Sequence, residues 1–210
     1  MSAADRFSEL LRDERIGASW REDSALAGMT IGMLAAHAGR AITQVLVLLE
    51  LPRPDGGREV VSAERYFARM SGTADRSAEL NRGVEARSRE DAGAGWEALI
   101  GRCAAAREAL AVRLAAEPAG RRVPVPHRPS EQLFLDEYLR TRLVEIAVHA
   151  DDLRVSLGDP ADLVAFVDSD ATGAAIEVLA GAARERSGDL AVLRALARRE
   201  RDPGQALRVL

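Results

Sequence analysis

A long apolar periodicity in the second half of the chain limits the fold more than any other feature. Between Tyr138 and Leu157, hydrophobic residues recur every three or four positions, at Leu139, Leu143, Ile146, Ala150, Leu153 and Leu157. This spacing is typical of a helix that buries one face. Only 4% of the residues are aromatic, which favours helices packed through Leu, Ala and Val over strands rich in Tyr, Phe and Trp. The sequence therefore predicts an all-α fold.

Four main helices follow from the periodicity and its interruptions, at residues 4–19, 30–51, 95–117 and 131–157. We expect Thr30 and Ser130 to cap the second and fourth, because a hydroxyl can accept hydrogen bonds from the free amides of a first turn. The proline-rich stretch 118–131 cannot be helical and should cross the molecule in extended form, strand-like at Val123–Val125. Such long connections suit a crossed-over four-helix bundle.

Weaker helical patterns complete the prediction, at residues 63–70, 74–87, 160–185 and 189–199. Asp91–Gly95 is expected to interrupt the helical pattern before the third main helix. The sequence contains no internal repeat and no linker that would divide it. We therefore predict a single domain, residues 1–210, in which the extra C-terminal helices lie against the four-helix bundle.

Charge and hydropathy argue against several classes of partner. The net charge of −4 does not suggest nucleic-acid binding. The N-terminal residues carry charges where a signal peptide needs an apolar run. The longest apolar stretch, residues 45–51, contains Glu50 and is far shorter than the roughly 20 residues of a membrane span. We expect a cytoplasmic protein that binds neither nucleic acid nor membranes, and the oligomeric state stays open, a homodimer included.

The chain has one cysteine, Cys103, which excludes an intramolecular disulfide and a zinc cluster built from cysteines. It lies in an alanine-rich helical stretch, where a small thiol packs as well as Ala or Val. We expect a packing residue and not a reactive thiol.

Polar residues run beside the apolar stripe of residues 138–157. Glu145 and His149 lie four positions apart, which places them about 40° apart around a helix and about 6 Å apart along its axis. A carboxylate and an imidazole at this spacing can bind one metal ion, and His37, on the helix 30–51, could supply a third ligand. The alternative is a hydrogen-bonded pair on a helix flank, with His37 as an ordinary core histidine.

Two further residues flank the pair on the same side of the helix. Asp152 could orient a ligand histidine, and Arg142 could hold the Glu145 carboxylate or an anionic substrate. The alternative for both is an ordinary ion pair on a helix surface. His127, the third histidine, lies between prolines and is expected to be a solvated loop residue.

Two segments resemble those of a known family. The segment SALAGMTIGMLAAHAGRA resembles the first signature of mycothiol-dependent maleylpyruvate isomerases and their DinB-like relatives, with Met29 at the position of the usual tryptophan. RLVEIAVHADDL looks like the second signature, Arg-x-x-Glu-x-x-x-His-x-x-Asp-Leu. The resemblance implies a DinB-like four-helix bundle that holds a zinc-like divalent metal through His37, Glu145 and His149.

The resemblance and the metal trio together suggest a reaction. Three protein ligands would leave one metal position open, where a thiol is deprotonated. We expect a zinc-dependent transferase, or an isomerase-like enzyme, that uses mycothiol on an unknown electrophilic small molecule, with Asp152 and Arg142 as catalytic residues. Hydrolysis at the same site and a non-enzymatic metal-binding module are the alternatives. Full maleylpyruvate isomerases have a second domain with a substrate-contacting arginine, and because this chain ends at Leu210 we expect no maleylpyruvate isomerisation.

Overall fold

The computed structural model describes residues 2–54, 56–70, 79–158, 169–197 and 204–209, and these confirm the predicted all-α class. The helices are α1 (Ala3–Leu10), α2 (Glu14–Ala18), α3 (Ile31–Glu50), α4 (Ala63–Ala68), α5 (Glu79–Gly93), α6 (Trp96–Ala116), α7 (Leu135–Ser156), α9 (Ser169–Ser187), α10 (Asp189–Ala197) and α11 (Gly204–Leu207). A small sheet joins β1 (Glu59–Val60), β2 (Arg122–Pro124) and β3 (Glu131–Phe134).

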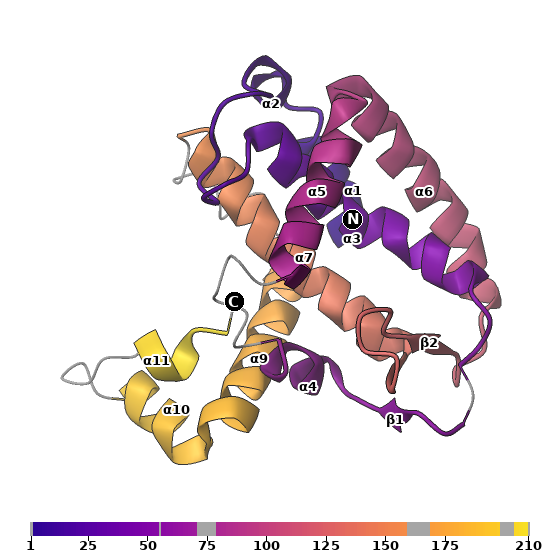
Figure 1. Ribbon diagram of the computed structural model, residues 1–210, viewed down its shortest axis with the longest axis vertical. Helices are drawn as coiled ribbons and strands as arrows, with labels where there is room; N and C mark the ends of the chain where they lie inside the picture. The colour runs from indigo at the N-terminus through magenta and orange to yellow at the C-terminus, as the bar shows by residue number, and fades with distance from the viewer. Residues whose placement is uncertain (1, 55, 71–78, 159–168, 198–203, 210) are drawn as a thin grey trace.

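Helix α3 lies at the centre of the molecule, between α5, α6 and α7 (Figure 1). Thirteen of its residues are buried, and they are spread over more than one side of the helix. Helix α1 contacts α6 and α7, which also contact α3. This arrangement of α1, α3, α6 and α7 is consistent with a DinB-like helical fold. The hydroxyl of Thr30 accepts from the amide of Met33 and caps α3, as predicted.

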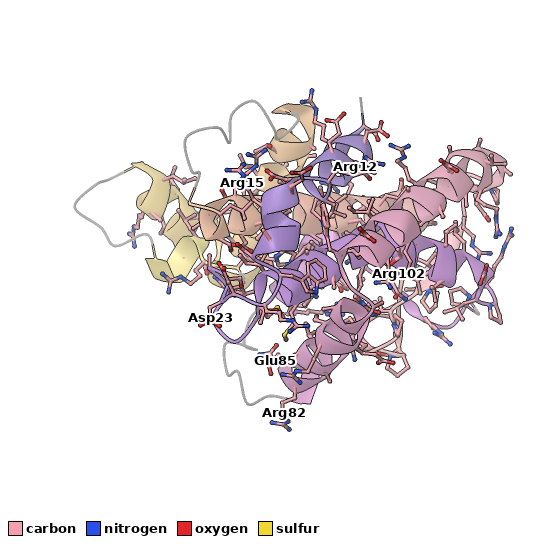
Figure 2. All side chains as sticks on the ribbon, turned by 90° about the horizontal axis from the view of Figure 1, so that it is seen from above. Arg12, Arg15, Asp23, Arg82, Glu85 and Arg102 are labelled. Atoms are coloured by element: carbon pink, nitrogen blue, oxygen red, sulfur yellow. The ribbon has the colours of Figure 1, made fainter. Side chains whose placement is uncertain are left out.

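The first predicted helix, residues 4–19, is wrong as one element, because the chain forms α1 and α2 instead. The side chain of Asp13 accepts a hydrogen bond from the amide of Arg15 and so starts a second helix. The residues expected to face inward, Phe7, Leu10, Leu11 and Ile16, are all buried. Charged residues between them project outward, as Arg12 and Arg15 do in Figure 2.

The start of the fourth predicted helix is also wrong. Ser130 does not cap a helix, because Glu131–Phe134 forms β3 and α7 begins only at Leu135. Strand β3 pairs antiparallel with β2, which confirms the extended stretch near Val123, and parallel with β1. The carbonyl of Ser130 accepts from the amide of Glu59. Pairing with β2 and with the distant strand β1 outweighs the local capping signal.

Helix α7 buries a wider face than the predicted stripe. Ile146, Ala150 and Leu153 are buried as expected, whereas Leu139, Leu143 and Leu157 are only partly buried. The face is wider because α3 and α9 pack against α7. The additional buried residues are Leu135, Tyr138, Thr141 and Val144.

The C-terminal helices lie against the rest of the molecule, as predicted. Helix α9 packs on α7 and α4, and α10 and α11 pack on α9 (Figure 1). The predicted break at Asp91–Gly95 comes later, because α5 continues to Gly93. Parts of the predicted helices 74–87, 160–185 and 189–199 lie outside the described residues.

Helix α3 is long and apolar enough to cross a membrane by length and composition alone. Most of its apolar residues, however, are in contact with other helices of this chain. Burial of this kind is compatible with the core helix of a soluble protein.

Candidate metal centre

Helices α3 and α7 pack against each other and bring the three predicted ligands together. The donor atoms of His37, Glu145 and His149 all lie within 4.8 Å of one another. Glu145 Oε2 lies 3.2 Å from His149 Nε2 and 3.9 Å from His37 Nε2. The two imidazole rings meet edge to face, with centroids 4.7 Å apart. The pair on α7 follows from its four-residue spacing, but the approach of His37 depends on the packing of the two helices.

The trio is mostly shielded from solvent but remains accessible. The side chains of His37, Glu145 and His149 are 21%, 19% and 12% exposed. They line a cavity of about 850 Å³. One face of α3 lines this cavity with one residue from each successive turn: His37, Arg40, Gln44 and Leu48. The cavity is large enough to admit a small molecule to the trio.

Burial and mutual contact set the charges of the trio. Burial lowers the pKa of His37 to about 4, and the neighbouring His149 acts in the same direction. Burial alone would raise the pKa of Glu145, but the hydrogen bond from His149 and the charge of Arg142 lower it to about 2. Burial alone would lower the pKa of His149, yet its bonds to Asp152 and Glu145 raise it to about 9. At neutral pH, His37 is therefore neutral and Glu145 is charged, and the ring of His149 lies between the side chains of Glu145 and Asp152.

The arrangement fits a divalent metal. Two imidazoles and one carboxylate are donors that zinc accepts, and the 4.8 Å spread allows small side-chain movements to close them on one ion. Asp152 Oδ2 lies 3.0 Å from His149 Nδ1 and would fix the ring so that Nε2 faces the ion.

A protein-family model matches most of the chain. The model of the mycothiol maleylpyruvate isomerase N-terminal domain matches residues 1–154. The chain belongs to this family. The match includes His37, Glu145 and His149, and it makes the region a mycothiol-related, DinB-like domain. No curated protein and no solved structure matches the chain.

Several cavity residues of this family member were not expected from the sequence. Tyr66 on α4 and Tyr138 on α7 line the cavity beside Arg142. Burial raises the pKa of Tyr138 to about 12 and raises that of Tyr66 as well, so both hydroxyls stay protonated. Tyr138 falls within the predicted helix 131–157, so its place beside the trio could have been predicted. The sequence around Tyr66 contains no pattern that predicts its contact with α7. His127 is an exposed loop residue, as predicted, and its ring lies 5.9 Å from that of Tyr66.

Cys103 lies in the core, on α6, as predicted. Its side chain is buried against Gly39, and burial raises the pKa of the thiol to about 11. Such a thiol stays protonated at neutral pH and is a poor nucleophile.

We therefore expect Cys103→Ala to leave metal binding and thiol-transfer activity nearly unchanged. The free energy of unfolding should fall by about 1 kcal/mol or less, because the change removes one small buried group. Urea unfolding, metal analysis and the transfer assay described below would measure the three quantities. Loss of activity in a variant with intact fold and metal would identify Cys103 as a nucleophile after all.

Proposed function

We propose that the chain is a single-domain, cytoplasmic, zinc-dependent transferase that joins mycothiol to a small electrophile. The observation that carries this proposal is the placement of His37, Glu145 and His149, with donor atoms within 4.8 Å, in the wall of an 850 Å³ cavity. Membership of a mycothiol-related family supports the choice of thiol.

The chemistry follows from the charge and number of the donors. A divalent metal in the trio supplies positive charge that lowers the pKa of an incoming thiol. The trio itself contributes a single negative charge, from Glu145. A divalent metal bound to it would therefore keep a net positive charge that attracts the thiolate. Three protein donors leave a fourth tetrahedral position for the sulfur. No nucleophile from the protein is needed, which agrees with the buried Cys103.

Asp152 and Arg142 would assist the trio in different ways. Asp152 holds the Nδ1 atom of His149 and keeps its Nε2 atom directed at Glu145. Arg142 Nη2 lies 3.9 Å from Glu145 Oε1 and helps to keep this carboxylate charged. Both residues line the same cavity as the trio.

The proposal is tested by incubating zinc-loaded protein with mycothiol and monochlorobimane. The mycothiol sulfur displaces chloride from the bimane, and the fluorescent thioether reports the rate. We expect wild-type protein to accelerate this reaction and His37→Ala to fall to the rate without protein. His127→Ala is the matched control, because it removes a histidine from the same cavity but not from the trio. Equal rates for wild type and His37→Ala would remove the transferase proposal.

Chelation separates the enzyme from a structural metal module. The core is formed by apolar residues of many helices, so the protein should keep its helical content without metal. Activity should disappear with a chelator and return with zinc, while the circular dichroism spectrum stays the same. Melting of the helices on chelation would favour a module in which the metal is structural.

A further inference from the structure

Three neighbouring side chains hold the guanidinium of Arg142. Its Nε atom donates to the hydroxyl of Thr141, at 3.1 Å. Its plane lies over the ring of Tyr138, 4.8 Å from the centroid. It also donates a hydrogen bond to the hydroxyl of Tyr66, which lies on α4. Within the described part of the chain, no buried nitrogen of Arg142 lacks a hydrogen-bond partner, so the position of the guanidinium is well defined.

The two oxygens of Glu145 face different partners. Oε2 lies 3.2 Å from His149 Nε2 and 3.9 Å from His37 Nε2. Oε1 lies 3.9 Å from Arg142 Nη2, on the i,i+3 side of α7. The positive charge of Arg142 therefore attracts Oε1, and Oε2 is left as the oxygen that faces the imidazoles. A charged neighbour of this kind orients a carboxylate ligand without binding the metal itself.

Tyr66 differs from the other two neighbours of Arg142 because it comes from a second helix. Thr141 and Tyr138 lie on α7, so they fix the guanidinium relative to its own helix. An arginine side chain has many rotamers, and each further contact reduces the number that it can adopt. The hydrogen bond to Tyr66 fixes the guanidinium relative to α4 as well.

Helix α4 is itself anchored to α7 and can therefore serve as a support. The amide of Ala63, in its first turn, donates to Glu137 Oε2, at 2.7 Å. Arg140 Nη2 donates to Glu64 Oε1, at 2.6 Å. The Tyr66 side chain that follows is buried, 7% exposed, and its hydroxyl is presented to Arg142 by an element that two polar contacts hold in place.

We propose that Tyr66 is a positioning residue of the metal centre, which acts on the ligand Glu145 through Arg142. The inference rests on the proposed zinc site and extends it to α4, a helix that carries none of the three ligands. By holding the guanidinium beside Oε1, Tyr66 keeps Glu145 turned with Oε2 toward the two imidazoles. Tyr66 thus preorganises the site without contact to the metal.

The zinc affinities of single and double variants test this role, because affinity is read without turnover. Tyr66→Phe removes the hydroxyl and keeps the ring. Competition with a chromogenic chelator should show about threefold to tenfold weaker zinc binding, the effect of one hydrogen bond. Arg142→Gln should weaken binding by about tenfold or more, as loss of a residue that orients a ligand does. The double variant should bind zinc as Arg142→Gln alone does, because the hydroxyl acts through the guanidinium.

Tyr138→Phe is the matched control. It makes the same exchange in the same cavity but keeps the ring over which the guanidinium lies, so zinc affinity should stay at the wild-type value. Thr141→Val provides a second route if Tyr66→Phe folds poorly. It frees the Nε donor and should weaken zinc binding in the wild-type background but not beside Arg142→Gln. Thermal unfolding followed by circular dichroism would verify the fold of each variant.

The outcomes separate the positioning role from the zinc site on which it rests. Wild-type protein that binds no zinc would overturn the site itself. Wild-type protein that binds zinc, with Tyr66→Phe unchanged, would overturn the positioning role alone. So would an equal loss from Tyr66→Phe in the wild-type and Arg142→Gln backgrounds, because the hydroxyl would then act through packing. A matching loss in Tyr138→Phe would overturn it too, since any buried hydroxyl of the cavity would then have the same effect.

Discussion

Replacing His149 by alanine is expected to lower the metal content of the purified protein by an order of magnitude or more. The variant keeps only His37 and Glu145 as protein ligands, and two donors hold zinc far more weakly than three. It also removes the ring that Asp152 holds through Nδ1. Metal analysis of the folded, monodisperse fraction after dialysis against trace metal would give the content per chain.

His127→Ala is the matched control for this experiment. It removes a histidine that lines the same cavity but does not belong to the trio, so its metal content should equal that of the wild type. Equal metal in His149→Ala and wild-type protein would show that the ion, if bound, lies elsewhere. A parallel loss in His127→Ala would show that the trio is incomplete as described.

Asp152→Ala is expected to weaken zinc binding by about tenfold to a hundredfold without removing a ligand. The carboxylate lies 3.0 Å from His149 Nδ1, so its loss frees the ring to rotate and lowers the basicity of the ligating nitrogen. Competition with a chromogenic chelator would measure the zinc affinity. Asp152→Asn should recover part of the loss, because the amide oxygen can still accept the Nδ1 hydrogen bond.

Asp151→Ala gives the control for the charge alone. Asp151 is the sequence neighbour of Asp152 on α7, but it is exposed and lies outside the set of cavity residues. If Asp151→Ala weakened zinc binding as much as Asp152→Ala does, the effect would be one of net charge and not of His149 orientation.

The sequence revealed the parts of the site that depend on local geometry. Glu145, His149 and Asp152 lie on one side of a single helix, so their spacing alone brings them together. Their partner His37 could be proposed because the chain has few histidines, but its approach required the packing of α3 on α7. The two family signatures linked these distant segments, because one contains His37 and the other contains Glu145 and His149.

The parts that were missed depend on contacts between distant segments. Ser130 has the side chain of a helix cap, yet its carbonyl pairs with Glu59 from another part of the chain, and the strand that results delays α7 to Leu135. Tyr66 lies in a short helix with a weak periodic pattern. Contacts of this helix with α7, such as the bond between Ala63 and Glu137, bring it to the cavity. Such pairings between remote residues leave no local pattern from which to predict them.

Metal analysis of the purified wild-type protein tests the central claim most directly. We predict one divalent metal ion per chain, zinc being the expected ion, bound by His37, Glu145 and His149. Elemental analysis of protein prepared without chelators would give the identity and stoichiometry of the metal, before and after incubation with zinc and removal of the excess. A protein that purifies without metal and takes up none when zinc is added would contradict the account.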